Sequence, residues 1–119
     1  MVKLESLKKS NHFKIALKEK KFHTDFFSIF AAKNFIKSKH KNTLRISFVM
    51  KKKIGNAVKR NKIKRKLKYA VQKVLHEKKL IDLNYTYVVF GKNNVYKDKF
   101  SNILYEVNKT FKKIQQVGN

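Results

Sequence analysis

The amino-acid sequence predicts an α+β domain, a small α/β sandwich in which helices pack on one mixed sheet. Segments with helical and with strand periodicity follow one another in the order α-β-β-α-β-α. The 119 residues include three glycines and no proline, so few sharp breaks are expected within the elements. Apolar residues make up 42% of the chain and aromatic residues 13%, which is enough for a real core. We expect a single domain over residues 1–119.

The first predicted element is a short helix over residues 10–20. Ser10 is a suitable N-cap, because its hydroxyl can accept a hydrogen bond from a free backbone N–H of the first turn. Phe13, Ala16 and Leu17 follow at the i, i+3, i+4 spacing of one helical face.

Two strands are predicted next from alternating side chains. Residues 25–31, DFFSIFA, form the first strand, and residues 43–51, TLRISFVMK, form the second. The first strand places Phe27 and Ile29 on one face and Phe26, Ser28 and Phe30 on the other. In the second strand, Ile46, Phe48 and Met50 alternate with Arg45, Ser47 and Val49.

Gly55 and Asn56 interrupt this pattern, and a long helix is predicted over residues 57–78. Five of its apolar residues share an arc of about 100°, wide enough to seat the helix on a sheet. They are Ile63, Leu67, Ala70, Val71 and Val74. Residues 85–90, YTYVVF, are rich in β-branched and aromatic side chains and predict a third strand. The last helix, over residues 98–116, has an apolar face of Phe100, Ile103, Val107, Phe111 and Ile114.

The charge of the chain indicates the class of its partner. Lysine and arginine number 31 against 7 acidic residues, a net charge of +24. Within residues 59–68, seven of ten positions are cationic and none is acidic. Like charges this close repel one another, so we expect a polyanion to compensate them. Nucleic acid is the first candidate, and an anionic membrane surface is the second.

Other features exclude several classes of protein. No stretch approaches the roughly 18 apolar residues of a membrane span. The N-terminus lacks the apolar segment of a secretory signal. The absence of cysteine excludes disulfides and thiolate zinc sites. We expect a cytoplasmic protein.

The cations of the long helix lie on both sides of its apolar stripe. Asn61, Lys64, Arg65 and Lys68 share one flank, whereas Lys59, Lys62, Lys66 and Lys73 occupy the other flank and the back. Arg60 lies at the edge of the stripe. A helix that only improves solubility would include acids, but the first one here is Glu77. A solvated lysine face is the alternative, and phosphate binding is favoured because arginine and lysine are the usual phosphate ligands.

Residues 52–70, KKIGNAVKRNKIKRKLKYA, closely resemble the signature of the protein subunit of bacterial ribonuclease P. The hallmark of that signature is an Arg-Asn-Arg helix followed by Ile-Lys-Arg and a further basic residue. The segments LKKSNHFKIAL, RISFVMKKK and YVVFGKN resemble the family's opening helix, the strand before the signature and a later strand.

The resemblance implies a fold and a function. The implied fold is an α-β-β-β-α-β-α sandwich with a left-handed crossover, against the usual right-handed preference. Its extra strand is expected around residues 43–46 or 32–36. The implied partners are the catalytic RNA subunit of ribonuclease P and precursor tRNA, with no membrane and no obligate protein partner. The RNA removes the 5′ leader of precursor tRNA with bound magnesium ions, and the protein binds this RNA and holds the leader in a cleft between the sheet and the opening helix.

The resemblance also assigns RNA-binding residues by position. The basic helix of the family matches Arg60, Asn61, Lys62, Lys64, Arg65 and Lys68, and its strand-end basic pair matches Lys52 and Lys53. One departure is Lys62, which stands where arginine is usual and replaces a bidentate fork with a point charge.

For the leader cleft, Phe13 matches an aromatic residue of the family, and Leu17 stands where a second phenylalanine is usual. Phe30 is the candidate aromatic residue on the facing strand. Phe26 is a weaker candidate, for which a place in the core is an equal alternative.

The sequence offers no chemistry of its own. The acidic residues are dispersed and the four histidines lack ligand spacing, so we expect no catalytic residue and no metal site in this chain. Two alternatives stay open. A ribosomal or other structural RNA-binding protein would share the charge and the fold, but not the pattern of residues 52–70. A protein-only nuclease would need clustered acids or histidines.

Overall fold

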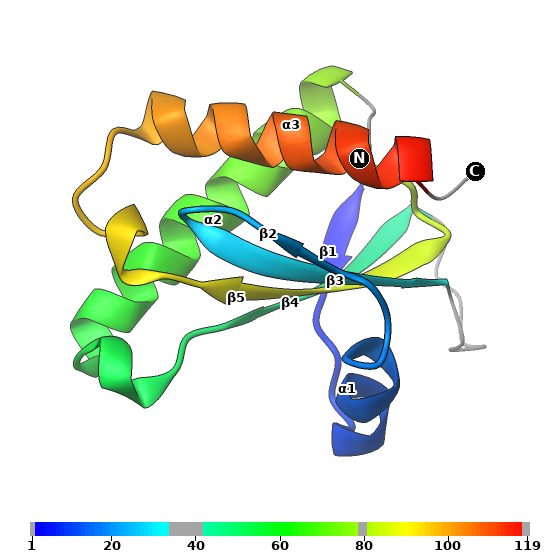
Figure 1. The fold of residues 1–119 in the computed structure, drawn as a ribbon, viewed down its shortest axis with the longest axis horizontal. Helices are drawn as coiled ribbons and strands as arrows, with labels where there is room; N and C mark the ends of the chain where they lie inside the picture. The colour runs from blue at the N-terminus through cyan, green and yellow to red at the C-terminus, as the bar shows by residue number, and fades with distance from the viewer. Residues whose placement is uncertain (1, 34–41, 79–80, 118–119) are drawn as a thin grey trace.

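The computed structural model describes residues 2–33, 42–78 and 81–117. In these residues a five-stranded sheet runs through the middle of the molecule (Figure 1). Its strands are β1 (Lys3–Glu5), β2 (Lys21–His23), β3 (Phe27–Lys33), β4 (Thr43–Val49) and β5 (Tyr85–Gly91). The helices are α1 (Ser10–Ala16), α2 (Ala57–Lys78) and α3 (Phe100–Val117), and the 3₁₀ turns are η1 (Lys52–Ile54) and η2 (Asn93–Val95).

The sheet is mixed, with the strand order β1-β4-β5-β3-β2. Strand β4 pairs in parallel with β1 and β5, whereas β3 pairs antiparallel with β5 and β2. Parallel neighbours cannot be joined by a tight turn. Helix α2 therefore supplies the crossover from β4 to β5, and the left-handed sense that the resemblance implies stays a prediction.

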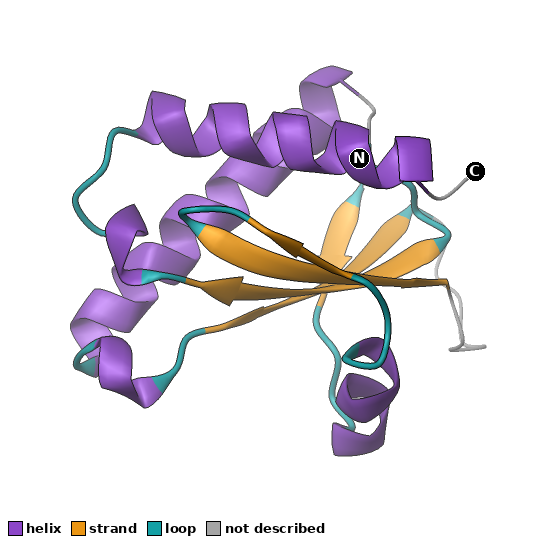
Figure 2. Cartoon of the chain, viewed as in Figure 1, coloured by secondary structure: helices purple, strands orange, loops and turns teal. Residues whose placement is uncertain are grey.

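Helices α2 and α3 cover one face of the sheet, and α1 lies against the other (Figure 2). The main core lies under α2 and α3. It buries the whole predicted stripe of α2 (Ile63, Leu67, Ala70, Val71 and Val74), together with Ile103, Val107, Phe111 and Ile114 of α3. A minor core under α1 consists of Leu7, Ala16, Ala32 and Val88.

Strand β5 is central and apolar on both faces. Tyr87 and Val89 enter the main core, whereas Val88 lies in the minor core. Successive side chains of a strand point to opposite faces, so a strand covered on both sides has a continuous apolar sequence. The hydroxyl of Tyr87 donates to the carbonyl of Asp82 at 3.1 Å, and burial raises the pKa of Tyr87 well above its ordinary value.

The order α-β-β-β-α-β-α is confirmed, because β2, β3 and β4 lie between α1 and α2. Both expected positions of the extra strand are wrong where the structure describes them. Residues 43–46 belong to β4 and residues 32–33 to β3, while residues 34–36 lie outside the described chain. The extra strand is β2, whose three residues are too few to show an alternation. Strand β1, equally short, was not predicted, whereas the bounds of α2 are confirmed.

Replacing Leu67 with alanine is expected to lower the free energy of unfolding by about 2–5 kcal/mol. Leu67 is 1% exposed between α2 and the sheet, so the truncation leaves a cavity. Val58→Ala on the same helix is the control, because Val58 is 66% exposed and its truncation should change stability by less than about 0.5 kcal/mol. Urea unfolding measures both variants. Parent-like stability of Leu67→Ala would contradict the assignment of the buried stripe.

Candidate nucleic-acid interface

The basic helix α2 begins at a defined cap. The side-chain oxygen of Asn56 accepts a hydrogen bond from the backbone N–H of Lys59 at 2.9 Å, the geometry of an N-cap. Gly55 precedes it with a φ of 156°, which other residues rarely adopt, and a Cβ there would lie 2.7 Å from Cδ of Lys59. Gly55 and Asn56 together fix where the basic helix starts.

Burial of the apolar stripe turns most cations of α2 toward solvent. The exposed polar residues of its first three turns are Asn61, Lys62, Lys64, Arg65 and Lys68. Within the described residues none of these cations pairs with a carboxylate, because the ion pairs present there involve Lys73 and Arg45 instead. The outer surface of α2 therefore carries uncompensated positive charge.

Lys66 differs from the other cations of α2, because it is half-buried and fully engaged. Its ammonium donates to the carbonyl oxygens of Val95 and Tyr96, both at 3.0 Å, and of Asp98 at 3.2 Å. An ammonium has three donors, and all three are used here. Lys66 thus binds the segment that follows β5 to the middle of α2. On the same side, the ammonium groups of Lys59 and Lys62 lie 5.2 and 5.8 Å from the ring centroid of Tyr96.

Arg60 lies at the edge of the stripe, as the helical projection predicts, and is half-buried. Its Nε is buried without a hydrogen-bond partner among the described residues. A buried donor without an acceptor costs about 1–3 kcal/mol. Arg60 is therefore a cation whose hydrogen bonding the chain itself leaves incomplete.

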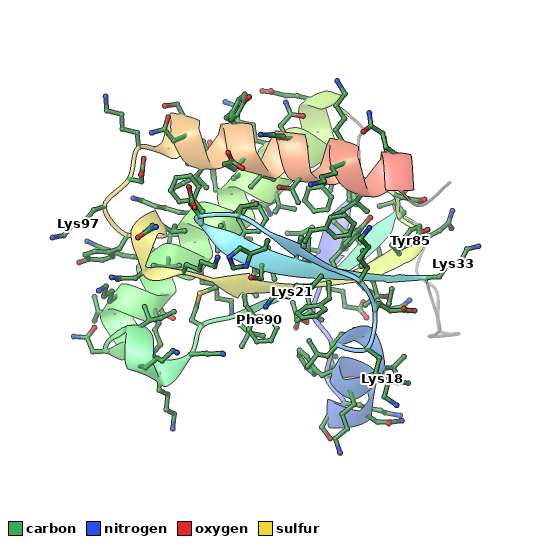
Figure 3. The ribbon with its side chains drawn as sticks, viewed as in Figure 1. Lys18, Lys21, Lys33, Tyr85, Phe90 and Lys97 are labelled. Atoms are coloured by element: carbon green, nitrogen blue, oxygen red, sulfur yellow. The ribbon has the colours of Figure 1, made fainter. Side chains whose placement is uncertain are left out.

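A groove of about 600 Å³ lies near the end of α1, where β3 and β5 run side by side. It is lined by Leu17, Lys21, His23, Ser28, Phe30, Lys51, Lys53, Ile54, Phe90, Gly91, Lys92 and Asn93. Phe30 and Phe90 meet edge to face, with ring centroids 5.9 Å apart. Phe90 points from β5 toward the side of the sheet that carries α1 (Figure 3). The groove thus combines two aromatic rings with four lysines.

Lys92 is held inside this groove by neighbouring polar groups. Its ammonium lies 2.8 Å from Nε2 of His23 and donates to the carbonyl of Thr24. On the same ring, Nδ1 of His23 and the hydroxyl of Ser28 form a hydrogen bond at 3.0 Å. Partial burial lowers the pKa of Lys92; nearby Lys21 acts in the same direction and Asp25 opposes it.

The structure places only some of the residues expected in the leader cleft at this groove. Phe30 and Leu17 line the groove, and so does Lys53 of the basic pair. Phe13 lies beside the groove: it is half-buried and packs on the same minor core as Phe30 and Phe90. Phe26 lies in the main core instead, because it precedes β3 and does not follow that strand's alternation.

Sequence reasoning did not find several groove residues. Phe90 joins Phe30 because β5 pairs with β3, which sets Ser28 opposite Phe90 and Phe30 opposite Val88. Lys21 comes from the unpredicted β2, and Lys92 follows β5. The segment YVVFGKN contains Phe90 and Lys92. Their place in the groove depends on the pairing of β3 with β5, which the sequence pattern does not show.

Within the ranges that the structure describes, no three His, Asp or Glu side chains come together in a group that could hold a metal ion. The groups that this surface offers to a ligand are the lysines and the aromatic rings of the groove and the cations of α2.

Comparison with known proteins gives consistent matches. The family model described as Ribonuclease P matches residues 1–115. The Ribonuclease P protein component of Rickettsia akari is 32% identical over 111 residues, covering 89% of this chain and 93% of the relative. That of Mesoplasma florum is 32% identical over 104 residues, covering 87% of this chain and 88% of the relative. In fold, the chain is similar to the RNase P protein from Thermotoga maritima, with a TM-score of 0.71, 23% identity and coverage of 92% and 96% of the two chains.

Lys66→Met is expected to lower the free energy of unfolding by about 1–3 kcal/mol, because three carbonyl oxygens lose their donor while the apolar stem is kept. Lys68→Met is the matched control: Lys68 is exposed on the same helix, and its loss should change stability by less than about 0.5 kcal/mol. The melting temperatures of the two variants, measured by thermal unfolding, test this difference. Identical melting of the two variants would mean that the Lys66 contacts do not hold the segment after β5.

Proposed function

The chain belongs to the ribonuclease P protein family, and on that premise we propose that it binds two RNAs on two surfaces. Helix α2 binds the catalytic RNA subunit of ribonuclease P. The groove beside α1 holds the 5′ leader of precursor tRNA. The protein thereby assists the RNA-catalysed removal of the leader and contributes no catalytic residue. The observation that carries the proposal is the exposed run of cations on α2, to which the described chain supplies no carboxylate partner.

The outer surface of α2 suits a folded RNA with closely spaced phosphates. Lys64, Arg65 and Lys68 are exposed at i, i+1 and i+4, so their side chains can reach neighbouring phosphates. Arg65 can bind a phosphate with two parallel hydrogen bonds. Arg60 is half-buried at the edge of the stripe and adds its positive charge to this surface.

The groove suits a single strand. Bases of single-stranded RNA stack on aromatic rings while cations hold the backbone. Phe30 and Phe90 supply the rings, and Lys21, Lys51 and Lys53 supply charge around them. We include Phe13 as a neighbouring platform, because it packs on the same minor core, and Leu17 as the aliphatic residue at the end of α1.

Magnesium belongs, in this proposal, to the RNA subunit and the substrate. In the part of the chain that the structure describes, no three His, Asp or Glu side chains form a group that could hold a metal ion. Among the described residues no helix is long and apolar enough to cross a membrane. We place the complex in the cytoplasm.

Arg65→Ala is expected to weaken binding to the RNA subunit and to lower the slope of log affinity against log salt by about one, because one phosphate contact is lost. The fold should be intact, since Arg65 is exposed. Equilibrium binding at several salt concentrations measures both quantities. Lys113→Ala, which removes an exposed cation of α3, is the control and should bind as the parent does. Unchanged affinity of Arg65→Ala near physiological salt would refute the role of α2.

Phe30→Ala is expected to weaken binding of precursor tRNA by the reconstituted enzyme about 5- to 150-fold, the loss of one stacked base. Binding of mature tRNA, which has no leader, should stay nearly unchanged. Leu17→Phe adds a ring at the edge of the groove and should tighten precursor binding. Equal losses for precursor and mature tRNA would show that Phe30 serves the fold or the RNA subunit and not the leader.

A further inference from the structure

A second hollow, of about 500 Å³, lies where α2 meets η2 and the start of α3. We call it the Tyr69 hollow; its lining residues are Lys62, Arg65, Lys66, Tyr69, Tyr96 and Phe100. It is separate from the groove beside α1 that we propose holds the 5′ leader (the leader groove), and the two share no lining residue. Every residue that lines it is cationic or aromatic.

Tyr69 offers the most accessible ring of this hollow. It is 59% exposed on α2, and its ring meets Phe100 edge to face with centroids 5.3 Å apart. Phe100 is half-buried against the main core, so it supports Tyr69 from one side. A tyrosine in this position presents a rigid ring to a ligand at a low cost in conformational entropy.

The opposite wall of the hollow is fixed in place. Lys66 holds the carbonyl oxygens of Val95 and Tyr96, and its donors have no capacity left for a ligand. The ring of Tyr96 is contacted by the ammonium of Lys62. The hollow therefore has a built shape, and its volume falls within the roughly 300–1,000 Å³ of small-ligand sites.

The charge of the hollow selects an anion that carries a flat apolar group. Arg65 precedes Tyr69 by one helical turn and Lys62 by two, so both cations lie on the same side of α2 as the ring. Both are exposed and make no ion pair with a described carboxylate. An acidic peptide would satisfy the cations but would leave the open ring unused. A nucleotide of an RNA satisfies both, because its base can stack while its phosphates meet the cations.

We propose that the Tyr69 hollow takes one unpaired base from the RNA that α2 binds, stacked on Tyr69, with Arg65 and Lys62 on the flanking phosphates. This inference rests on the proposed function, since it adds a base contact to a surface otherwise assigned to phosphates. It predicts that α2 distinguishes an RNA with an unpaired base at this position from a uniform duplex.

The test uses the full chain and the RNA subunit of ribonuclease P without substrate. Tyr69→Ala is expected to weaken binding about 5- to 150-fold, the loss of one stacked base. Tyr69→Phe keeps the ring and should bind within about twofold of the parent. Tyr105→Ala is the matched control, because Tyr105 is 64% exposed on α3, and it should also bind as the parent does. The slope of log affinity against log salt should be the same for Tyr69→Ala as for the parent, since stacking releases no counterion.

Each other outcome has a distinct meaning. Parent-like binding by Tyr69→Ala overturns the base contact and leaves the phosphate role of α2 intact. A loss in Tyr69→Phe as large as in Tyr69→Ala overturns stacking in favour of the hydroxyl. A lowered salt slope in Tyr69→Ala means that Tyr69 acts by placing Arg65, which also overturns the proposal. Failure of the parent protein to bind the RNA subunit is a failure of the proposed function itself.

Discussion

The packing of the α2 stripe on the sheet is the contact on which the rest of the structure depends. Ile63, Leu67 and Ala70 are essentially inaccessible, so burial of this stripe fixes which face of α2 meets the sheet. With that face buried, the cations between the stripe positions must point outward or lie along its edge. The same sequence pattern that closes the main core therefore creates the basic surface. Repulsion among these cations opposes folding, and an RNA partner would relieve it.

The segment from Lys92 to Asp98 connects the basic helix with the leader groove. Lys92 and Asn93 line the groove, while the carbonyl oxygens of Val95 and Tyr96 are held by Lys66 of α2. Lys66, one cation of the basic run, therefore has a structural role, because it holds the part of this segment that follows the groove residues. The two proposed RNA surfaces share no residue, and the segment after β5 contributes to the groove at one end and is bound by α2 at the other.

Much of the fold could be predicted from the sequence, because long elements carry periodic patterns. The bounds of α2 and the five residues of its stripe are visible in the spacing of apolar residues. Strands β1 and β2 could not be found, since three residues carry no period. Contacts between segments that are far apart in the sequence could not be predicted either. Neither the pairing that joins Phe90 to Phe30 nor the engagement of Lys66 with the carbonyls after β5 follows from local sequence. For Phe26 the pattern allowed two positions, and the structure places it in the core.

The central claim is that the uncompensated charge of α2 is the determinant of RNA binding. The most direct test is the affinity of the chain for the RNA subunit of ribonuclease P at salt concentrations between 50 and 200 mM. If about six to ten phosphates are neutralised, affinity should fall about 10³-fold or more across this range, because each contact releases a condensed counterion. A nearly flat plot of log affinity against log salt would contradict the account, since binding would then depend on something other than the cations of the basic helix.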